Sequence, residues 1–436
     1  MERPQRVLNF LDIVFLSLGG QSPFLSILTY GAVVIATIGT FAPIAVILGT
    51  LLTLINGLTV YELSKRFTKE GGYYTYAWYS LTKKLGLETG WVYILYSSFY
   101  GSAYILGTTY LISHIFNVNP WFVILFVLFL SSLFMALGIR PSSKYAIFAS
   151  SLEIGILVAL SLLFISSTGF RFYNPFHVSL NFSKLFFAIL FGSSIPTGYG
   201  SIAPISGEVK NPKRTVSMAI VTVILLGGLL ASFDIYGILD HLVYFHISLN
   251  GLDILKLIES KFGLLTLIFV IFAAFNDGVL GSLSFMLATS RTIFAMAENE
   301  IFPKQLTKLA PERGPIYSNY VTIMLYILSS LTALYIFKNP FVAFEIVGGI
   351  SLLANLFVHI ASNFSLLRIS LRRISKRLLE LIIAVIAAIY SIITLVYSSE
   401  SSATAAIDFF LLFIIAGFLF AEIRDMAINE EPEERK

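Results

Sequence analysis

The chain has 436 residues, of which 57% are hydrophobic and only 12% are charged. A soluble globular domain is about one quarter charged, so this composition excludes an ordinary soluble protein and predicts a polytopic membrane protein. The net charge of +4 says little until the charges are placed along the chain. There is no cysteine, which excludes disulfide bonds, thiolate chemistry and cysteine-based metal sites.

Apolar stretches of roughly 20 residues, the length that a helix needs to cross a bilayer, recur along the chain. They predict an all-α fold with twelve spans, at 8–33, 40–63, 88–116, 120–139, 146–168, 185–207, 215–239, 263–290, 317–337, 341–366, 378–398 and 404–423. We expect one transmembrane domain over residues 1–426, a charged and disordered cytoplasmic tail over 427–436, and no cleaved signal peptide.

Lysine and arginine are unevenly distributed between the segments that join these spans. If the N-terminus lies inside, the outer segments hold only Arg171, Lys184, Lys256, Lys261 and Lys338, and all other lysines and arginines are cytoplasmic. Cytoplasmic loops of membrane proteins carry such an excess of basic residues. The pattern predicts a plasma-membrane protein with both termini in the cytoplasm. A span count that is wrong by one would remove this charge asymmetry, so the asymmetry also supports twelve spans.

Two of the twelve spans contain residues that interrupt helices. The first contains SLGGQSPF (17–24), and the sixth contains FGSSIPTGYGSIAPISGE (191–208). If spans one to five and six to ten are two repeats, the breaks occupy matching positions, and the second repeat is inverted because five is odd. A matched pair of interrupted spans is the best sequence indication of a transporter's binding site.

The interruptions have a physical use. Proline removes a helical N–H and clashes with the preceding turn, while glycine lowers the cost of leaving helical geometry. Backbone groups freed in this way cannot face lipid and must be buried in protein or line a watery cavity. There a half-helix N-terminus attracts a carboxylate, and freed carbonyls accept from an ammonium group, so the breaks suit a small zwitterion.

Glycine in membrane helices also permits close packing of neighbouring helices. That simpler interpretation is open for Gly227-Gly228 and for Gly348-Gly349. Two interrupted spans in matched repeat positions favour the binding site over packing alone.

Four stretches carry a family resemblance: YELSKRFTKEGGYYTYAW (61–78), LGLETGWVYILYSSFYGSAY (85–104), GYGSIAPISGEVKNPKRTVSMAI (198–220) and TSRTIFAMAENEIFPKQLTKLAPERGP (289–315). Together, over spans one to ten, they resemble the amino acid–polyamine–organocation (APC) superfamily of transporters. The resemblance implies two inverted five-helix repeats, about 8–168 and 185–366, with two additional helices over about 378–423. It also implies uptake or exchange of amino acids or related amines.

In the family, substrates commonly bind between the unwound parts of the first and sixth helices. The corresponding residues here are Gly19, Gly20, Gln21, Ser22, Ile195, Pro196, Thr197, Gly198 and Tyr199. This chain departs from the family pattern at three points: Thr68 replaces a usual proline, GGQSPF replaces Gly-Ser-Gly-Ile-Phe, and Gly200 stands where an acidic residue is frequent. A strongly cationic substrate therefore loses one expected partner.

The charge at helix ends is too weak to account for substrate binding by itself. A charge at a helix end contributes about 0.3–2 kcal/mol, whereas micromolar binding needs about 8 kcal/mol. Tyr100, Tyr104 and Phe191 are candidate pocket walls or gates that would add apolar burial. Since 15% of the residues are aromatic, simple packing is the competing interpretation for each of them.

Ionisable residues inside spans are costly and tend to be functional. Glu153 and Asp277 lie well inside the fifth and eighth spans, and each is expected to be protonated, paired or holding a cation. Some proton-coupled members of the resembling family have a lysine where Glu153 stands, so we expect Glu153, with Asp277, to carry a coupling proton. The competing interpretation is a structural role for both. Asp234, Glu345 and His359 are weaker candidates.

The favoured function is a secondary amino acid transporter, working as a proton-coupled symporter or as an exchanger, with sodium coupling and a homodimer left open. The alternatives are a polyamine or other amine permease, a channel, and a solute sensor with a transporter fold. No constellation typical of an intramembrane enzyme and no nucleotide-binding loop occurs. We expect no cofactor, no nucleic acid and no metal. Two histidines after the seventh span, His241 and His246, are only weak evidence for a metal site.

Overall fold

The computed structural model describes residues 4–177, 181–249, 253–311 and 313–429, and it is helical almost throughout. The predicted cytoplasmic tail lies mostly outside these residues. The helical elements are α1 (Phe10–Gln21), α2 (Pro23–Ser26), η1 (Ile27–Gly31), α3 (Ala32–Ile38), η2 (Gly39–Phe41), α4 (Ala42–Ser64), α5 (Tyr73–Ser80), α6 (Lys83–Phe116), α7 (Pro120–Leu137), α8 (Ile139–Ser167), α9 (Phe182–Ser193), η3 (Ile195–Ser201), η4 (Ala203–Glu208), α10 (Pro212–Tyr244), α11 (Ile254–Glu298), η5 (Lys304–Thr307), α12 (Ile316–Phe337), α13 (Pro340–Leu371), α14 (Ile374–Ser401) and α15 (Thr404–Asn429). A two-stranded hairpin, β1 (Leu309–Ala310) and β2 (Gly314–Pro315), lies between η5 and α12.

Among the described residues, ten helical stretches are long and apolar enough to cross a membrane. One of them, Phe10–Ser64, has 55 residues and turns at Gly39, whose φ is +62°. The 34-residue helix α6 is not among the ten. The chain is thus a multi-pass helical membrane protein, and a count of twelve spans stays a prediction.

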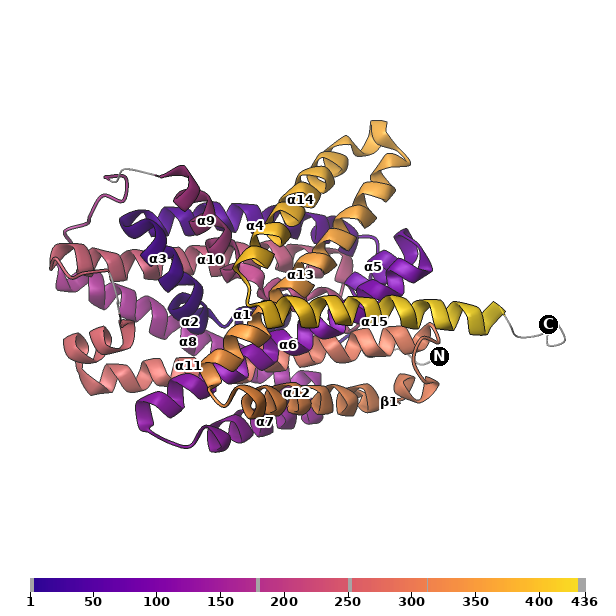
Figure 1. The fold of residues 1–436 in the computed structure, drawn as a ribbon, viewed down its shortest axis with the longest axis horizontal. Helices are drawn as coiled ribbons and strands as arrows, with labels where there is room; N and C mark the ends of the chain where they lie inside the picture. Colours follow the sequence, from indigo (N-terminus) through magenta and orange to yellow (C-terminus); the bar gives the residue numbers. More distant parts are fainter. Residues whose placement is uncertain (1–3, 178–180, 250–252, 312, 430–436) are drawn as a thin grey trace.

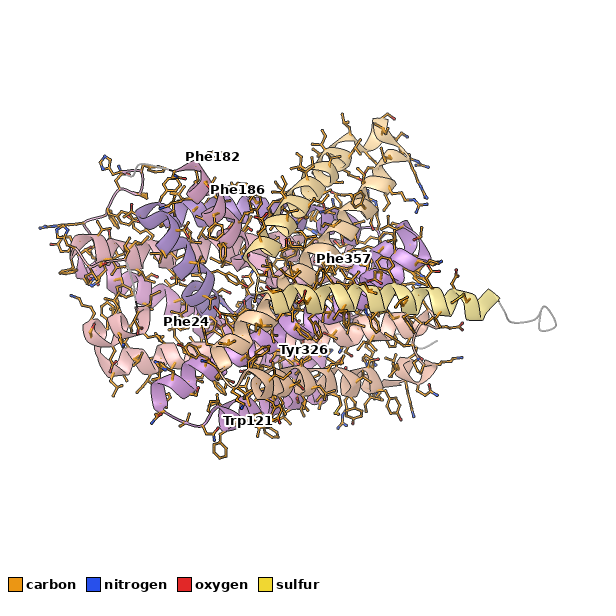
Figure 2. All side chains as sticks on the ribbon, viewed as in Figure 1. Phe24, Trp121, Phe182, Phe186, Tyr326 and Phe357 are labelled. Carbon is orange, nitrogen blue, oxygen red and sulfur yellow. The ribbon has the colours of Figure 1, made fainter. Side chains whose placement is uncertain are left out.

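The first segment of the chain and the end of α15 lie at the same end of the molecule, together with α5 and the β1–β2 hairpin (Figure 1). The connections after α8 and α10 lie at the opposite end (Figure 1). Aromatic side chains are both inside and outside: Phe24 is among the helices, whereas Trp121 and Phe182 are at the periphery (Figure 2). An apolar periphery is what a surface in contact with lipid requires.

Small residues let α4 approach the helices of the second half. A Cβ on Gly49 would come 2.5 Å from the backbone nitrogen of Ser193, and a Cβ on Gly228 would come 2.0 Å from the Thr50 hydroxyl oxygen. For Gly228 the packing interpretation therefore holds. The Asn363 amide joins α13 to α4 and α14 by donating to Asn56 (3.0 Å) and Ser391 (3.1 Å).

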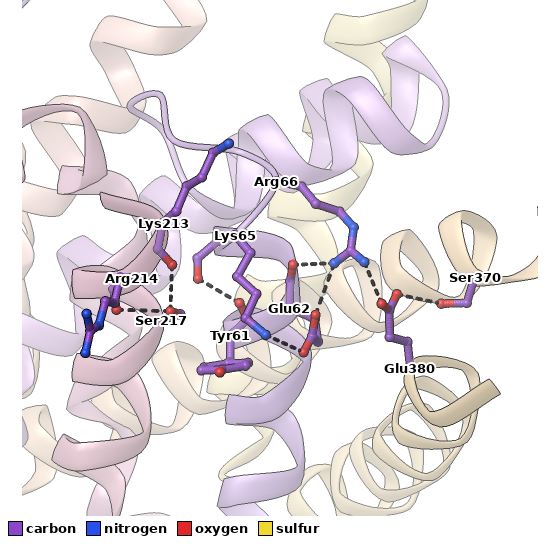
Figure 3. A network of polar contacts seen from close by, with 10 residues as sticks. Tyr61, Glu62, Lys65, Arg66, Lys213, Arg214, Ser217, Ser370 and Glu380 are labelled. Atoms are coloured by element: carbon purple, nitrogen blue, oxygen red, sulfur yellow. Dashed lines mark hydrogen bonds and ion pairs between the residues drawn. The ribbon is translucent and has the colours of Figure 1, made fainter. Parts of the chain in front are cut away.

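Charged side chains gather where α4 ends. Arg66, just beyond the end of α4, donates to Glu62 of that helix and to Glu380 of α14 at 2.6 Å, and Lys65 pairs with Glu62 at 2.9 Å (Figure 3). Ser217, in the first turns of α10 beside this cluster, bonds to the carbonyls of Lys213 and Arg214 (Figure 3). The chain continues from α4 into α5, which lies at the same end of the molecule as the first chain segment (Figure 1).

Candidate functional site

The first span is broken at Ser22. This residue adopts a left-handed conformation (φ 46°, ψ 67°), its N–H donates to the Gly19 carbonyl at 3.1 Å, and Pro23 then starts α2. The two glycines before it stay helical and serve close packing instead: a Cβ on Gly19 would come 2.8 Å from the Leu280 side chain. The predicted break is present, but proline rather than glycine sets its position.

The sixth span is broken as well. Helix α9 ends at Ser193, and Pro196 has non-helical angles (φ −85°, ψ 37°) within η3. A second 3₁₀ segment with its own proline, η4, follows before α10 begins. Prolines in both 3₁₀ segments prevent a continuous α-helical ladder, so the backbone from Ser194 to Glu208 has to find other partners.

The two breaks face each other. Gly198 of η3 lies directly on Gln21 at the end of α1, where a Cβ would come 2.4 Å from the Gln21 backbone nitrogen. The Gln21 side chain extends past this contact and donates to the Val223 carbonyl of α10 at 3.0 Å. A Cβ on Gly227 would come 1.9 Å from the Gln21 amide oxygen, so this glycine makes room for that side chain.

A small cavity of about 30 Å³ lies beside the breaks. Its lining includes Thr197 of η3, the predicted wall residues Tyr100 and Tyr104, and also Tyr30, Tyr96 and Asn355. Phe191 lies outside this lining and borders a neighbouring cavity, which shares Tyr30, Ser194 and Leu352 with the first. A cavity of this size holds only a few water molecules, so it must widen to accept a solute.

Aromatic hydroxyls from α6 hold the freed backbone. Tyr104 lies 3.0 Å from the Ser26 hydroxyl and 3.5 Å from the Gln21 carbonyl, and Tyr93 donates to the Gly200 carbonyl at 3.0 Å. A Cβ on Gly200 would come 2.5 Å from the Tyr96 hydroxyl, so Tyr96 occupies the room that a side chain at position 200 would need. Tyr199 does not line the cavity, and its hydroxyl lies 3.1 Å from Nε2 of His359.

Glu153 and Asp277 are brought together at the first break. Asp277 of α11 accepts from the Leu25 N–H at 2.7 Å, and its backbone carbonyl accepts from the Ser22 hydroxyl at 3.1 Å. Glu153 of α8 accepts from the Asn276 amide at 2.9 Å and lies within hydrogen-bonding reach of Asp277. Both carboxyl groups are fully buried.

Each of these carboxyl groups keeps one oxygen, Oε1 of Glu153 and Oδ1 of Asp277, without a hydrogen-bond partner among the described residues. Two ionised carboxylates so close together repel each other and can only accept hydrogen bonds. One proton shared by the two groups removes this repulsion and leaves a single negative charge. That charge faces the N-terminus of α2, where helix polarity favours it.

A second pair of buried charges lies where the first chain segment meets the sixth span. Arg291 of α11 donates to Glu208 through two nitrogens, at 2.8 and 3.2 Å, and to Asn319 at 3.2 Å. Both members of the pair are buried. The sequence pattern placed Arg291 in a cytoplasmic segment, but it lies inside α11 and has no exposed surface.

The first chain segment is bonded to the same place. Leu8 forms a parallel bridge with Val209, the N–H groups of Val7 and Leu8 donate to the Glu208 carbonyl at 2.8 and 3.0 Å, and Lys210 donates back to Leu8. Beside it, burial raises the pKa of Glu70, whose carboxylate lies where a Cβ on Gly207 would be. We call the Glu208–Arg291 pair and this bridge the latch.

The weaker candidates lie elsewhere. Asp234 bonds to Ser161 of α8, and Glu345 is exposed on α13. His241 lies within α10 rather than in a loop, with its ring nitrogen 2.6 Å from the Ser167 hydroxyl. None of these side chains lines the cavity beside the breaks.

Comparison with known proteins fits this architecture. The family model of amino acid permeases matches residues 12–425, nearly the whole chain, and the chain therefore belongs to that family. A serine/threonine exchanger of Bacillus subtilis, SteT, is 28% identical over 281 residues, which cover 59% of this chain and 60% of the relative. A low-affinity putrescine importer of Escherichia coli, PlaP, is 24% identical over 248 residues, 53% of each chain. The matched region thus spans less than two thirds of each relative.

Replacing Gly198 by alanine tests the contact between the breaks. The added methyl group has to push Gln21 aside, and overpacking of this kind costs roughly 1–3 kcal/mol. We expect Gly198→Ala to melt at a lower temperature than the unmodified protein. Gly155→Ala is the matched control, because nothing lies within 4 Å of a Cβ there. Equal melting temperatures for the two variants would contradict the contact.

Replacing Arg291 tests the latch. Arg291→Met leaves Glu208 buried without its partner, which typically costs about 3–5 kcal/mol of stability, and Arg291→Met combined with Glu208→Met should recover part of that loss. Lys84→Ala removes an exposed pair with Glu422 and should hardly change thermal unfolding. A fully additive double variant would show that the two side chains do not interact.

Proposed function

We propose that the protein is a secondary active transporter that moves a small amino acid across the plasma membrane by alternating access. The observation that carries the proposal is the pair of facing helix breaks beside a small cavity. Freed backbone beside a cavity is the usual location of a transporter's substrate site, and the interruptions at Ser22 and Pro196 come from different parts of the chain. Membership of the amino acid permease family supports the same function.

In this proposal the substrate lies between Gln21, Ser22 and the segment from Ile195 to Tyr199. The N-terminus of α2 is its natural carboxylate site, but Asp277 already accepts from Leu25 there. A proton taken up by the Glu153–Asp277 pair removes the remaining negative charge. The helix terminus is then free to attract a substrate carboxylate.

Competition between the Asp277 carboxylate and the substrate carboxylate for this helix end would couple proton uptake to substrate binding. If protonation of the pair favours substrate binding, substrate binding favours protonation by the same factor, and the two cross together. One charge moving through 100 mV contributes about 2.3 kcal/mol, roughly fifty-fold in accumulation. Exchange of one amino acid for another is the other mode that the same site supports.

The proposed topology is twelve spans, formed by two inverted repeats and two further helices, with both termini in the cytoplasm. The end of the molecule with Lys65, Arg66, Arg214 and the latch is then cytoplasmic, as an excess of basic residues favours. The Glu208–Arg291 pair becomes an inner gate that has to separate when the site opens to the cytoplasm.

A polyamine or other amine permease is the second candidate. It is favoured by the similarity to a putrescine importer and by the carboxyl pair at the break, which an ammonium group could approach. Against it, the described residues that line the cavity include no acidic side chain. A dication buried there would lack a partner for its charge.

Glu153→Gln tests the proton coupling. The amide cannot release a proton, so uptake driven by a pH gradient should be lost in proteoliposomes, while counterflow of the same amino acid at a fixed pH continues. Asp234→Asn is the control, since Asp234 bonds to Ser161 away from the break. Unchanged uptake and pH dependence in Glu153→Gln would reject the coupling role, and a requirement for sodium would replace the proton as the coupling ion.

A further inference from the structure

The cavity beside the breaks is neutral. Its described lining comes from η1, α6, η3, α13 and their neighbours, and it contains tyrosines, small residues and an asparagine but no Asp, Glu, Lys, Arg or His. A charged substrate side chain buried here would be without a counter-charge, which is costly for a buried charge. The lining therefore selects against acidic and basic side chains.

Several polar groups on the lining already have partners. The Ser351 hydroxyl donates to the Tyr96 carbonyl at 3.1 Å, the Thr197 hydroxyl donates to the Ser194 carbonyl at 2.8 Å, and Tyr104 bonds to Ser26. These groups gain little from a substrate hydrogen bond, because they would have to give up an existing one. They shape the cavity instead.

Two polar groups on the lining stand apart. The hydroxyl of Tyr96 on α6 and the amide oxygen of Asn355 on α13 have no hydrogen-bond partner among the described residues, although Tyr96 is only 1% exposed and Asn355 only 6%. A buried polar atom without a partner is unfavourable. Both groups are therefore suited to receive a partner that arrives with the substrate.

A hydroxyl group complements this pair because it donates one hydrogen bond and accepts another. It can donate to the Asn355 oxygen and accept from the Tyr96 hydroxyl. A methyl group in the same place leaves both atoms unsatisfied, and a site built to hydrogen-bond a hydroxyl discriminates against the analogue that lacks it.

We propose that Asn355 and Tyr96 form a side-chain subsite that selects small neutral amino acids with a hydroxyl group, of the serine and threonine kind. The inference rests on the proposed transport function and deepens it. The similarity to a serine/threonine exchanger agrees with this class, whereas a putrescine substrate offers only ammonium groups to a neutral cavity.

Counterflow in proteoliposomes tests the subsite. Vesicles containing the full-length protein are preloaded with unlabelled amino acid, and uptake of labelled serine is measured against competing serine, threonine, alanine, valine, arginine and putrescine. We expect serine and threonine to compete best. In Asn355→Leu the preference for serine over alanine should fall by roughly fivefold to tenfold, the effect of one neutral hydrogen bond, and Tyr96→Phe should shift it in the same direction.

Ser362→Ala is the matched control on α13, because among the described residues the Ser362 hydroxyl bonds only to the Val358 carbonyl of its own helix. The serine preference of this variant should stay unchanged. Counterflow that prefers valine, arginine or putrescine would overturn the subsite and leave transport intact. An equal loss of serine and alanine affinity in Asn355→Leu would also overturn it. Absence of counterflow by any compound, with protein that melts cooperatively, would overturn the transport function as well.

Discussion

Every backbone polar group inside a membrane needs a partner, and this constraint shapes the middle of the molecule. Two helices stop there, at Ser22 and at Ser194, and neither break can face lipid. The breaks pack on each other at Gly198 and Gln21, and the hydroxyls of Tyr93 and Tyr104 donate to freed backbone carbonyls. The cavity lies beside them because protein, not lipid, surrounds this backbone.

The same constraint accounts for the buried charges. The N-terminus of α2 exposes N–H groups after the break, and Asp277 reaches them from α11 while Glu153 approaches from α8. Three segments far apart in sequence are thus joined by one helix end and two carboxyl groups. At the cytoplasmic end in our proposal, Glu208 and Arg291 form the corresponding contact between the second broken segment and α11. Helix α11 touches both regions, so it is placed to link them.

Sequence patterns predicted much of this architecture. Apolar length and helix breakers located the long helices, but α8 starts well before its predicted span, at Ile139, and α11 (Ile254–Glu298) extends well beyond its predicted span at both ends. Helices α5 and η5 and the β1–β2 hairpin were missed, because they are short or polar and carry no span signal. The glycines in GGQSPF indicated the right segment, but both stay helical. Their lack of a side chain is explained by close packing against Leu280 and Ser284. Family resemblance, rather than periodicity, pointed to residues 195–199.

Other features depend on three-dimensional contacts that no local pattern encodes. Asn355 is one polar residue in a long helix, and only its lack of a partner inside a neutral cavity distinguishes it. Arg291 was grouped with loop residues because its charge outweighed the helical pattern around it, whereas its pairing with Glu208 is a contact 83 residues apart. The proximity of Glu153 and Asp277 likewise depends on how α8 and α11 pack.

The most direct test of the central claim, that substrate binds between the two breaks, uses the absence of cysteine. Thr197→Cys places the only thiol of the protein on the cavity lining, and its alkylation by a small water-soluble reagent can be followed in proteoliposomes. A saturating amino acid that undergoes counterflow should slow this reaction, while leaving that of Gln305→Cys, an exposed position in η5, unchanged. Alkylation of Thr197→Cys that is insensitive to every transported amino acid would contradict a substrate site between the breaks.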